Sequence, residues 1–242
     1  MESEGNEDIP SKVTSVFRAL PHLPSYWPAV TGPAVVSWGA HWDTTDKSRV
    51  ENGRPKCREY PPPPRESVPQ DQLAAFDEMV SQRGNVPDIG PISVMINVPE
   101  LARRSEHFRA YMRGDESSLP LNVRERAMIL TAREMDCQFI WNAHCAFARQ
   151  AGLSDELVNN LRDKKNLHTL SAEEAAVVNY GRALFQTRKV SQPVYDAALA
   201  LFGVRGLVEL TNLLGYYSSL AFNINAFDVG LPDNITESPL PV

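Results

Sequence analysis

The part of the chain after residue 66 carries helix signals throughout and no convincing alternation of apolar and polar residues that would indicate a strand. Apolar residues recur at helical spacing, and glycines that can end a helix separate the segments: Gly84, Gly114, Gly152 and Gly203. The last segment, 207–227, is apolar on most of its faces and is therefore expected to be buried. These signals predict an all-α bundle of about eight helices.

Two helix starts can be predicted from capping residues. Ser67, with Pro69 close behind it, is expected to cap the first helix, which should end before Gly84. Ser171 and Glu174 have the spacing of a capping box, in which each side chain accepts a hydrogen bond from the backbone of the other.

Residues 1–64 differ in composition from the rest. Glycine and proline recur, and the stretch ends in four consecutive prolines, 61–64, which should form a stiff polyproline II connector. Trp27, Trp38 and Trp42 nonetheless lie here, whereas disordered chains are poor in aromatic residues. We therefore predict an extended N-terminal arm, 1–64, that docks on the body or on a neighbouring subunit, and a helical domain, 65–242.

Composition and charge narrow the classes of function. The net charge of -6 gives no basic surface for nucleic acid, so a nucleic-acid partner is not expected. The segment from Met1 to Asp8 is acidic and polar, unlike a secretory signal, and no run approaches about eighteen uninterrupted apolar residues. We therefore expect a cytoplasmic protein without a membrane partner, whose three cysteines remain reduced thiols.

Three side chains that can move protons lie on one apolar helical stretch: Glu125, Cys137 and His144. Cys137 and His144 are seven residues apart, so a helix places them on nearly the same face. In one unbroken helix, Glu125 would lie about 18 Å from Cys137 along the axis and roughly 120° around it. The sequence offers one place for a break, where Asp136 can cap a second helix that begins at Cys137.

This spacing resembles the signature of the carboxymuconolactone decarboxylase and alkylhydroperoxidase D superfamily, with a likeness that runs from about Arg58 to Pro232. The resemblance implies an alkylhydroperoxidase D-like helical bundle in which the acid of one helix packs beside the Cys and His of the next. It also implies homo-oligomers, commonly trimers or hexamers. In that arrangement the Cys137 thiol lies in the first turn of its helix, where its pKa should be lowered. One position departs from the peroxidase branch, because its second cysteine is replaced here by Ile140.

Three functions are compatible with these residues. The first is a cofactor-independent decarboxylase or related lyase that acts by acid/base chemistry on a small carboxylated lactone or β-keto-type acid. His144 would give or shuttle the proton, Glu125 would be its partner, and Cys137 would assist. The second is a thiol peroxidase that uses Cys137 with an external reductant, because Cys145 lies too far along a helix for a disulfide. The third is a non-catalytic oligomeric binder of a small molecule.

Each of these residues also has a purely structural interpretation. Glu125 could complete a cap that starts at Asn122, Cys137 could be a small buried residue, and His144 could be a hydrogen-bonded core histidine.

A substrate carboxylate requires a cation, and four arginines flank the site in the sequence: Arg124, Arg126, Arg133 and Arg149. We expect no cofactor and no metal, because Cys137 and His144 supply only two ligands and the other histidines lack ligand-like spacing.

Overall fold

The computed structural model describes residues 50–51, 54–55, 61–165, 167, 169–233 and 235–241. Most of the predicted N-terminal arm lies outside these residues, including Trp27, Trp38, Trp42 and Cys57. The described parts of the arm are the prolines at 61–64 and two short antiparallel strands, β1 (Val50–Glu51) and β2 (Arg54–Pro55). Pro64 has φ -64° and ψ 142°, the geometry of polyproline II. The docking of the arm and its boundary at residue 64 stay predictions.

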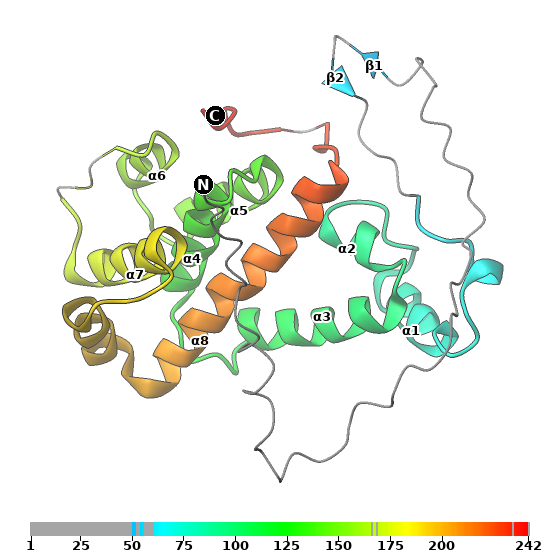
Figure 1. Cartoon of the computed structure of the whole chain (residues 1–242), viewed down its shortest axis with the longest axis horizontal. Coiled ribbons are helices and arrows are strands. Elements are labelled where there is room, and N and C mark those ends of the chain that lie inside the picture. The colour runs from blue at the N-terminus through cyan, green and yellow to red at the C-terminus, as the bar shows by residue number, and fades with distance from the viewer. Residues whose placement is uncertain are drawn as a thin grey trace, which may run out of the picture. The chain divides into compact units, whose positions relative to one another are not determined.

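The remaining described chain is helical, which confirms the predicted all-α fold (Figure 1). Eight α-helices follow one another in these residues: α1 (Leu73–Arg83), α2 (Pro91–Met95), α3 (Pro99–Arg113), α4 (Leu121–Glu134), α5 (Gln138–Gln150), α6 (Asp155–Arg162), α7 (Ala172–Arg182) and α8 (Gln192–Phe227). A 3₁₀ turn, η2 (Arg65–Ser67), precedes α1, and a π-helical segment, η3 (Ala183–Thr187), continues α7.

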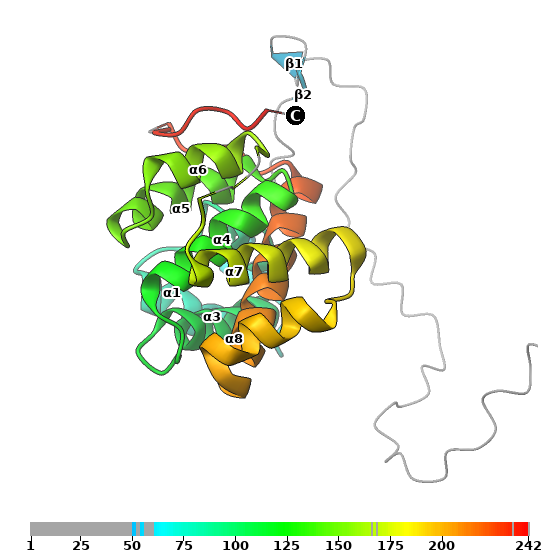
Figure 2. The same ribbon diagram turned by 90° about the vertical axis from the view of Figure 1, so that its left-hand side faces the viewer.

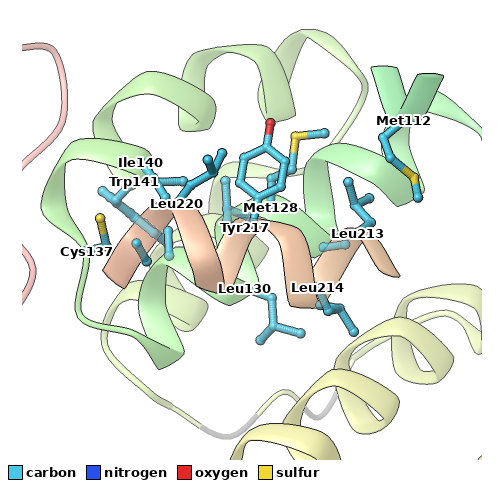
Figure 3. Packing of buried hydrophobic residues seen from close by; sticks show 14 of the residues in the cluster. Met112, Met128, Leu130, Cys137, Ile140, Trp141, Leu213, Leu214, Tyr217 and Leu220 are labelled. Atoms are coloured by element: carbon cyan, nitrogen blue, oxygen red, sulfur yellow. The ribbon is translucent and has the colours of Figure 1, made fainter. Parts of the chain in front are cut away.

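Helix α4 lies at the centre of the bundle and packs against α5, α7 and α8 (Figures 1 and 2). Its residues from Glu125 to Arg133 are all buried, so this part of the helix has no solvent-facing side. Figure 3 shows the apolar cluster along α8, with Ile140, Trp141 and Leu220 near one end of the segment drawn. Any charged residue in the buried part of α4 must therefore find its partner inside the fold.

The capping box and the predicted helix stops are confirmed. The Ser171 Oγ atom accepts a hydrogen bond from the Glu174 amide at 3.3 Å, and the Glu174 carboxylate accepts one from the Ser171 amide at 2.8 Å. Gly84 ends α1 with φ 77°. Gly203, with φ 62°, interrupts α8, so the apolar 207–227 segment belongs to the part of that helix after the kink.

The predicted cap at Ser67 is wrong. Ser67 ends η2, and α1 begins only at Leu73 without a side-chain cap. Val68 precedes Pro69 and is extended, with φ -72° and ψ 129°. A proline ring clashes with a helical conformation of the residue before it, so a helix cannot run from Ser67 through Val68.

By length and composition alone, α8 is the one helix of the described residues that could cross a membrane. One face of α8 is buried against α4, α7 and α2, and the helix carries the charged residues Arg205 and Glu209. A helix that packs one face into the core of a bundle needs apolar residues on that face, so packing accounts for part of this character.

Glu209 connects α8 to the segment between α3 and α4. Its buried carboxylate accepts hydrogen bonds from the Tyr111 hydroxyl at 2.8 Å, the Ser118 amide at 2.7 Å and the Arg205 guanidinium at 3.0 Å. Burial alone would raise the pKa of Glu209, but these hydrogen bonds outweigh it and hold the pKa at about 2. The carboxylate therefore stays charged at neutral pH and stabilises the folded state.

Replacing Glu209 with Gln is expected to lower the free energy of unfolding by about 2–3 kcal/mol at pH 7, because charged hydrogen bonds are lost. The pKa is lower in the folded than in the unfolded chain, so this advantage of the wild type should shrink below about pH 4 and vanish towards pH 2. Urea denaturation between pH 7 and 3 measures the difference. Glu116→Gln, the same change at an exposed residue, is the control; an equal loss there would contradict the assignment.

Candidate functional site

The predicted break before Cys137 is present. Helix α4 ends at Glu134, Asp136 adopts a left-handed conformation with φ 46°, and α5 begins at Gln138. Cys137 itself, rather than Asp136, is the N-cap residue of α5, so the second helix starts one residue later than predicted. Aspartate tolerates the left-handed conformation better than most residues, and the buried Arg133 forms an ion pair with Asp136 in the turn.

The break brings Glu125 of α4 next to His144 of α5. The Oε2 atom of Glu125 lies 2.9 Å from Nδ1 of His144, and the two residues are 1% and 7% exposed. Glu125 does not complete a cap with Asn122, because Pro120 is the N-cap of α4 and the side-chain Nδ2 of Asn122 donates to Glu173. A carboxylate can only accept, so it holds the imidazole with Nδ1–H as the donor and leaves Nε2 for other groups.

Tyr217 of α8 completes a chain of three polar groups. Its hydroxyl oxygen lies 3.3 Å from Nε2 of His144, and the two rings meet edge to face with centroids 5.2 Å apart. Burial raises the pKa of Tyr217, so the hydroxyl keeps its proton and donates a hydrogen bond to Nε2. Sequence reasoning missed this residue, because a tyrosine in the apolar 207–227 segment carries no signal that separates it from the core.

Cys137 lies at the start of α5, as the break requires, but its surroundings are apolar. The residue is fully buried, and Figure 3 shows it at the same end of the apolar cluster as Trp141. Burial raises the pKa of the Cys137 thiol and outweighs the opposing hydrogen bonds from the Ile140 and Phe139 amides. The predicted lowering of this pKa is therefore wrong. Burial likewise raises the pKa of Cys145.

A cavity of about 320 Å³ opens beside the chain of polar groups. His144 and Tyr217 lie on its wall, together with apolar and aromatic side chains that include Ile92, Met95, Phe139, Ile140 and Leu220. Cys137 is not among the described residues that line the cavity, whereas Ile140 is. Among the described residues, the polar groups on the cavity wall thus include the His144 imidazole and the Tyr217 phenol, but neither Cys137 nor Cys145. No group of three or more His, Cys, Asp or Glu side chains in the described residues could hold a metal ion.

The arginines at the cavity are not those expected from the sequence. Arg83, Arg109 and Arg113 line it. The four arginines predicted to flank the site have other partners: Arg124 donates to the Met112 and Gly114 carbonyls, Arg126 pairs with Glu173, Arg133 donates to the Arg162 and Pro241 carbonyls, and Arg149 pairs with Asp155 and Glu237. The four arginines that neighbour the site in sequence thus lie on other faces of α4 and α5. Arginines from α1 and α3 line the cavity instead.

Solved structures identify the class of fold. The chain is similar to an uncharacterized peroxidase-related protein from Ralstonia eutropha JMP134, described as an alkylhydroperoxidase AhpD core, with a TM-score of 0.56 and 15% identity over 74% of this chain and 94% of that one. It is also similar to an uncharacterized peroxidase-related protein from Silicibacter sp. TM1040, with a TM-score of 0.54 and 16% identity over 70% and 88% of the two chains. A protein of unknown function from Agrobacterium tumefaciens gives a TM-score of 0.50 and 17% identity over 55% and 92%. The bundle thus has the alkylhydroperoxidase D-like fold.

Part of the sequence matches a family model. Residues 99–180 match the model of the Carboxymuconolactone decarboxylase family, and this segment contains Glu125, Cys137 and His144 but not Tyr217. No curated protein matches the sequence. This partial match and the fold are both consistent with the carboxymuconolactone decarboxylase and alkylhydroperoxidase D-like superfamily that the sequence resembles.

The burial of Cys137 and Cys145 predicts slow reaction with thiol reagents. In a Cys57→Ser variant, which removes the thiol outside the described residues, the folded protein should react with dithionitrobenzoate at least about tenfold more slowly than free cysteine at pH 8. Unfolding in urea should expose both remaining thiols to rapid reaction. Peptide mapping identifies the labelled residue, and rapid labelling of Cys137 in the folded protein would contradict the assignment.

Proposed function

We propose that the cavity is the active centre of a cofactor-independent enzyme that uses acid/base chemistry on a small carboxylated molecule. The observation that carries this proposal is the buried chain from Glu125 through His144 to Tyr217, two members of which lie on the cavity wall. A titratable group held by a second group at the edge of an apolar pocket is an arrangement suited to proton transfer at one defined position. The match to the Carboxymuconolactone decarboxylase family supports a lyase of that kind.

Each group has a distinct role in this proposal. His144 gives or takes the proton at Nε2, and Glu125 holds the opposite ring nitrogen and stabilises the imidazolium when it forms. When His144 is protonated at Nε2 it can donate to the Tyr217 oxygen, and Tyr217 then passes its own proton to a substrate atom. Cys137 has a supporting role, because it caps α5 inside the apolar core.

The reaction that fits these groups is loss of carbon dioxide from a β-keto-type acid or an unsaturated carboxylated lactone. The bond between carbon and the carboxylate breaks, carbon dioxide leaves, and the electron pair delocalises into the carbonyl of the substrate as an enolate or dienolate. In the resting site Nε2 carries no proton, so His144 first takes one from solvent and becomes the imidazolium that Glu125 stabilises. That proton then adds to carbon, directly or through Tyr217, and leaves the histidine neutral. The apolar wall favours this step because it removes water from the carboxylate that leaves.

A thiol peroxidase is the second candidate, because two of the similar structures are described as peroxidase-related proteins. In this reaction the Cys137 thiolate attacks a hydroperoxide, the O–O bond breaks, and an alcohol and a sulfenic acid form. Two molecules of an external thiol, oxidised to a disulfide, then restore the cysteine and release water. The buried thiol with its raised pKa and the isoleucine at 140 disfavour this reaction, so we rank acid/base chemistry first.

One panel of assays separates the two candidates. The protein is incubated with carboxylated lactones and β-keto acids, and in parallel with a hydroperoxide and a thiol reductant. The lyase proposal expects release of carbon dioxide that falls at least about a hundredfold in His144→Ala and about tenfold in Tyr217→Phe, but persists in Cys137→Ser. Circular dichroism and thermal melting establish that each variant is folded.

Cys145→Ser is the matched control, because it changes a second buried thiol of the same helix. Peroxide consumption that is abolished by Cys137→Ser alone would overturn the ranking in favour of the peroxidase. Activity in neither assay would leave the third interpretation, a small-molecule binder without chemistry.

We also propose that the protein self-associates through α8, in line with the homo-oligomers that the family resemblance implies. After the Gly203 kink, exposed residues without charge follow one another along this helix at intervals of three and four: Val204, Val208, Asn212, Gly215, Ser219 and Phe222. Val208 and Phe222 are the same number of residues from Gly215. An antiparallel second copy, related by a two-fold axis at Gly215, would therefore place each Val208 against the partner's Phe222.

The centre of this stripe is open enough for a close helix crossing. A Cβ atom at Gly215 would meet nothing within 4 Å, while Val208 and Phe222 are 56% and 62% exposed. A two-fold contact occurs in a symmetric hexamer but not in a simple trimer, so it favours the hexamer of the two assemblies expected from the family.

The cytoplasmic location and the absence of nucleic-acid and membrane partners stay predictions from the sequence.

Like charges on this stripe should break the contact. The double variant Val208→Glu and Phe222→Glu is expected to halve the molar mass that light scattering measures after size-exclusion chromatography, because carboxylates would face one another across the two-fold axis. Tyr195→Glu, at an exposed aromatic residue of α8 before the kink, is the control. An unchanged mass in the double variant would contradict the proposed interface.

A further inference from the structure

Three arginines line the cavity. Arg83 is the last residue of α1, and Arg109 and Arg113 lie one turn apart at the end of α3. The exposed fractions of their side chains are 34%, 38% and 34%. These guanidinium groups are therefore accessible to a ligand but partly shielded from water, where charge-assisted hydrogen bonds are stronger than at a fully solvated surface.

Glu106 compensates part of this positive charge. Its Oε2 atom accepts a hydrogen bond from Nη2 of Arg83 at 2.9 Å, and its Oε1 atom accepts one from Nε of Arg109 at 2.8 Å. Burial alone would raise the pKa of Glu106, but the interactions with Arg109 and Arg83 outweigh it and lower the pKa, so the carboxylate stays charged. Two guanidinium groups thus share one carboxylate, which leaves an excess of positive charge.

Arg113 lacks a comparable partner. Its Nη2 atom lies 3.9 Å from Oε1 of Glu125, which is beyond hydrogen-bond distance. The other carboxylate oxygen of Glu125 is engaged by His144. Among the described residues no other acidic side chain forms an ion pair with Arg113. Its guanidinium group, with five N–H donors, therefore has hydrogen-bonding capacity left for a ligand in the cavity.

The rest of the cavity indicates the shape of that ligand. Phe139 and Tyr216 contribute aromatic rings to the wall, and Ile92 and Leu220 contribute aliphatic side chains. The Tyr216 hydroxyl donates to the Ser105 carbonyl at 3.0 Å, which helps to fix the ring in place. A volume of about 320 Å³ lies at the small end of the range for ligand sites. A small flat molecule with an apolar body and an anionic group at one end matches these walls.

We propose that Arg113 binds the carboxylate of a small planar carboxylic acid in this cavity, with Arg109 as the second cation. This inference rests on the proposed function, because it states how the same site holds its substrate. A carboxylate bound to a guanidinium group is stabilised before the reaction, so it anchors the substrate, and the carboxylate that leaves as carbon dioxide is a second one on the same molecule. The reacting carbon then lies towards His144 and Tyr217, which line the same cavity.

Binding of simple probes tests the inference without turnover. Isothermal titration calorimetry with benzoate, benzamide and inorganic phosphate compares a planar anion, a planar neutral molecule and an anion without a planar body. The wild type is expected to bind benzoate about tenfold more tightly than benzamide, and more tightly than phosphate. In Arg113→Gln the affinity for benzoate should fall about tenfold while that for benzamide is unchanged. Arg113→Lys should recover part of the loss, because lysine keeps the charge but not the fork of donors.

Arg104→Gln is the matched control, because Arg104 is an exposed residue of α3 that pairs with Glu100 and does not line the cavity. Three results would overturn the inference: no preference of the wild type for benzoate over benzamide or phosphate, equal losses of both aromatic ligands in Arg113→Gln, or the same loss in Arg104→Gln. His144→Ala should keep benzoate binding and lose catalysis, so failure of the anion site is distinguishable from failure of the proposed chemistry.

Discussion

The site depends on the left-handed turn between α4 and α5. Glu125 and His144 are 19 residues apart, a separation of about 28 Å along a continuous helix, yet the turn at Asp136 brings their side chains to 2.9 Å. A non-glycine residue in this conformation costs about 1–2 kcal/mol, which neighbouring contacts must offset. The buried Arg133 pairs with Asp136 and also donates to two backbone carbonyls, and Asn225 donates to the Met135 carbonyl at 2.9 Å. The turn is therefore held by the fold around it.

The polar groups of the core connect the candidate site to the stability of the whole bundle. Helix α4 is buried from Glu125 to Arg133, and its charged residues there find partners on other elements: His144 on α5, Glu173 on α7 and a carbonyl at the end of α6. Removal of one partner from such a pair leaves a buried charge, which destabilises a fold strongly. A loss of activity in a variant of Glu125 could therefore reflect either chemistry or folding. Variants of Tyr217 and Arg113 separate the effect on chemistry from the effect on folding better, because each residue has a weaker contact with the Glu125–His144 pair.

Most of the fold, and part of the site, could be predicted from the sequence. Helical periodicity, glycine stops and the Ser171 capping box are local signals, and the structure confirms them. The break before Cys137 was also predictable, because only a break allows Glu125 to lie beside a side chain of the next helix. The raised pKa of Cys137 was not predictable, since burial in an apolar core outweighs the lowering effect of the helix N-terminus on the thiol.

The residues that complete the cavity could not be predicted, because they come from distant segments. Tyr217 comes from α8, and Arg109 and Arg113 come from α3, whereas the arginines beside the signature in sequence lie on other faces. No local pattern distinguishes Arg113 from the other arginines of its helix. It differs in its position at the last turn of α3, where it lies near Glu125 but outside hydrogen-bond distance.

Ile140 helps to explain why an alkylhydroperoxidase D-like fold would suit proton transfer in this chain. A cysteine at this position would place a polarisable, oxidisable group on the cavity wall, whereas isoleucine gives an apolar surface beside His144. Low polarity near a histidine strengthens its interaction with Glu125 and the field of Arg113 at the ligand. It also removes water from a developing carbanion until the proton arrives. In the proposed enzyme, the residue that excludes a two-cysteine redox cycle thus also favours acid/base chemistry, and both consequences follow from one apolar side chain.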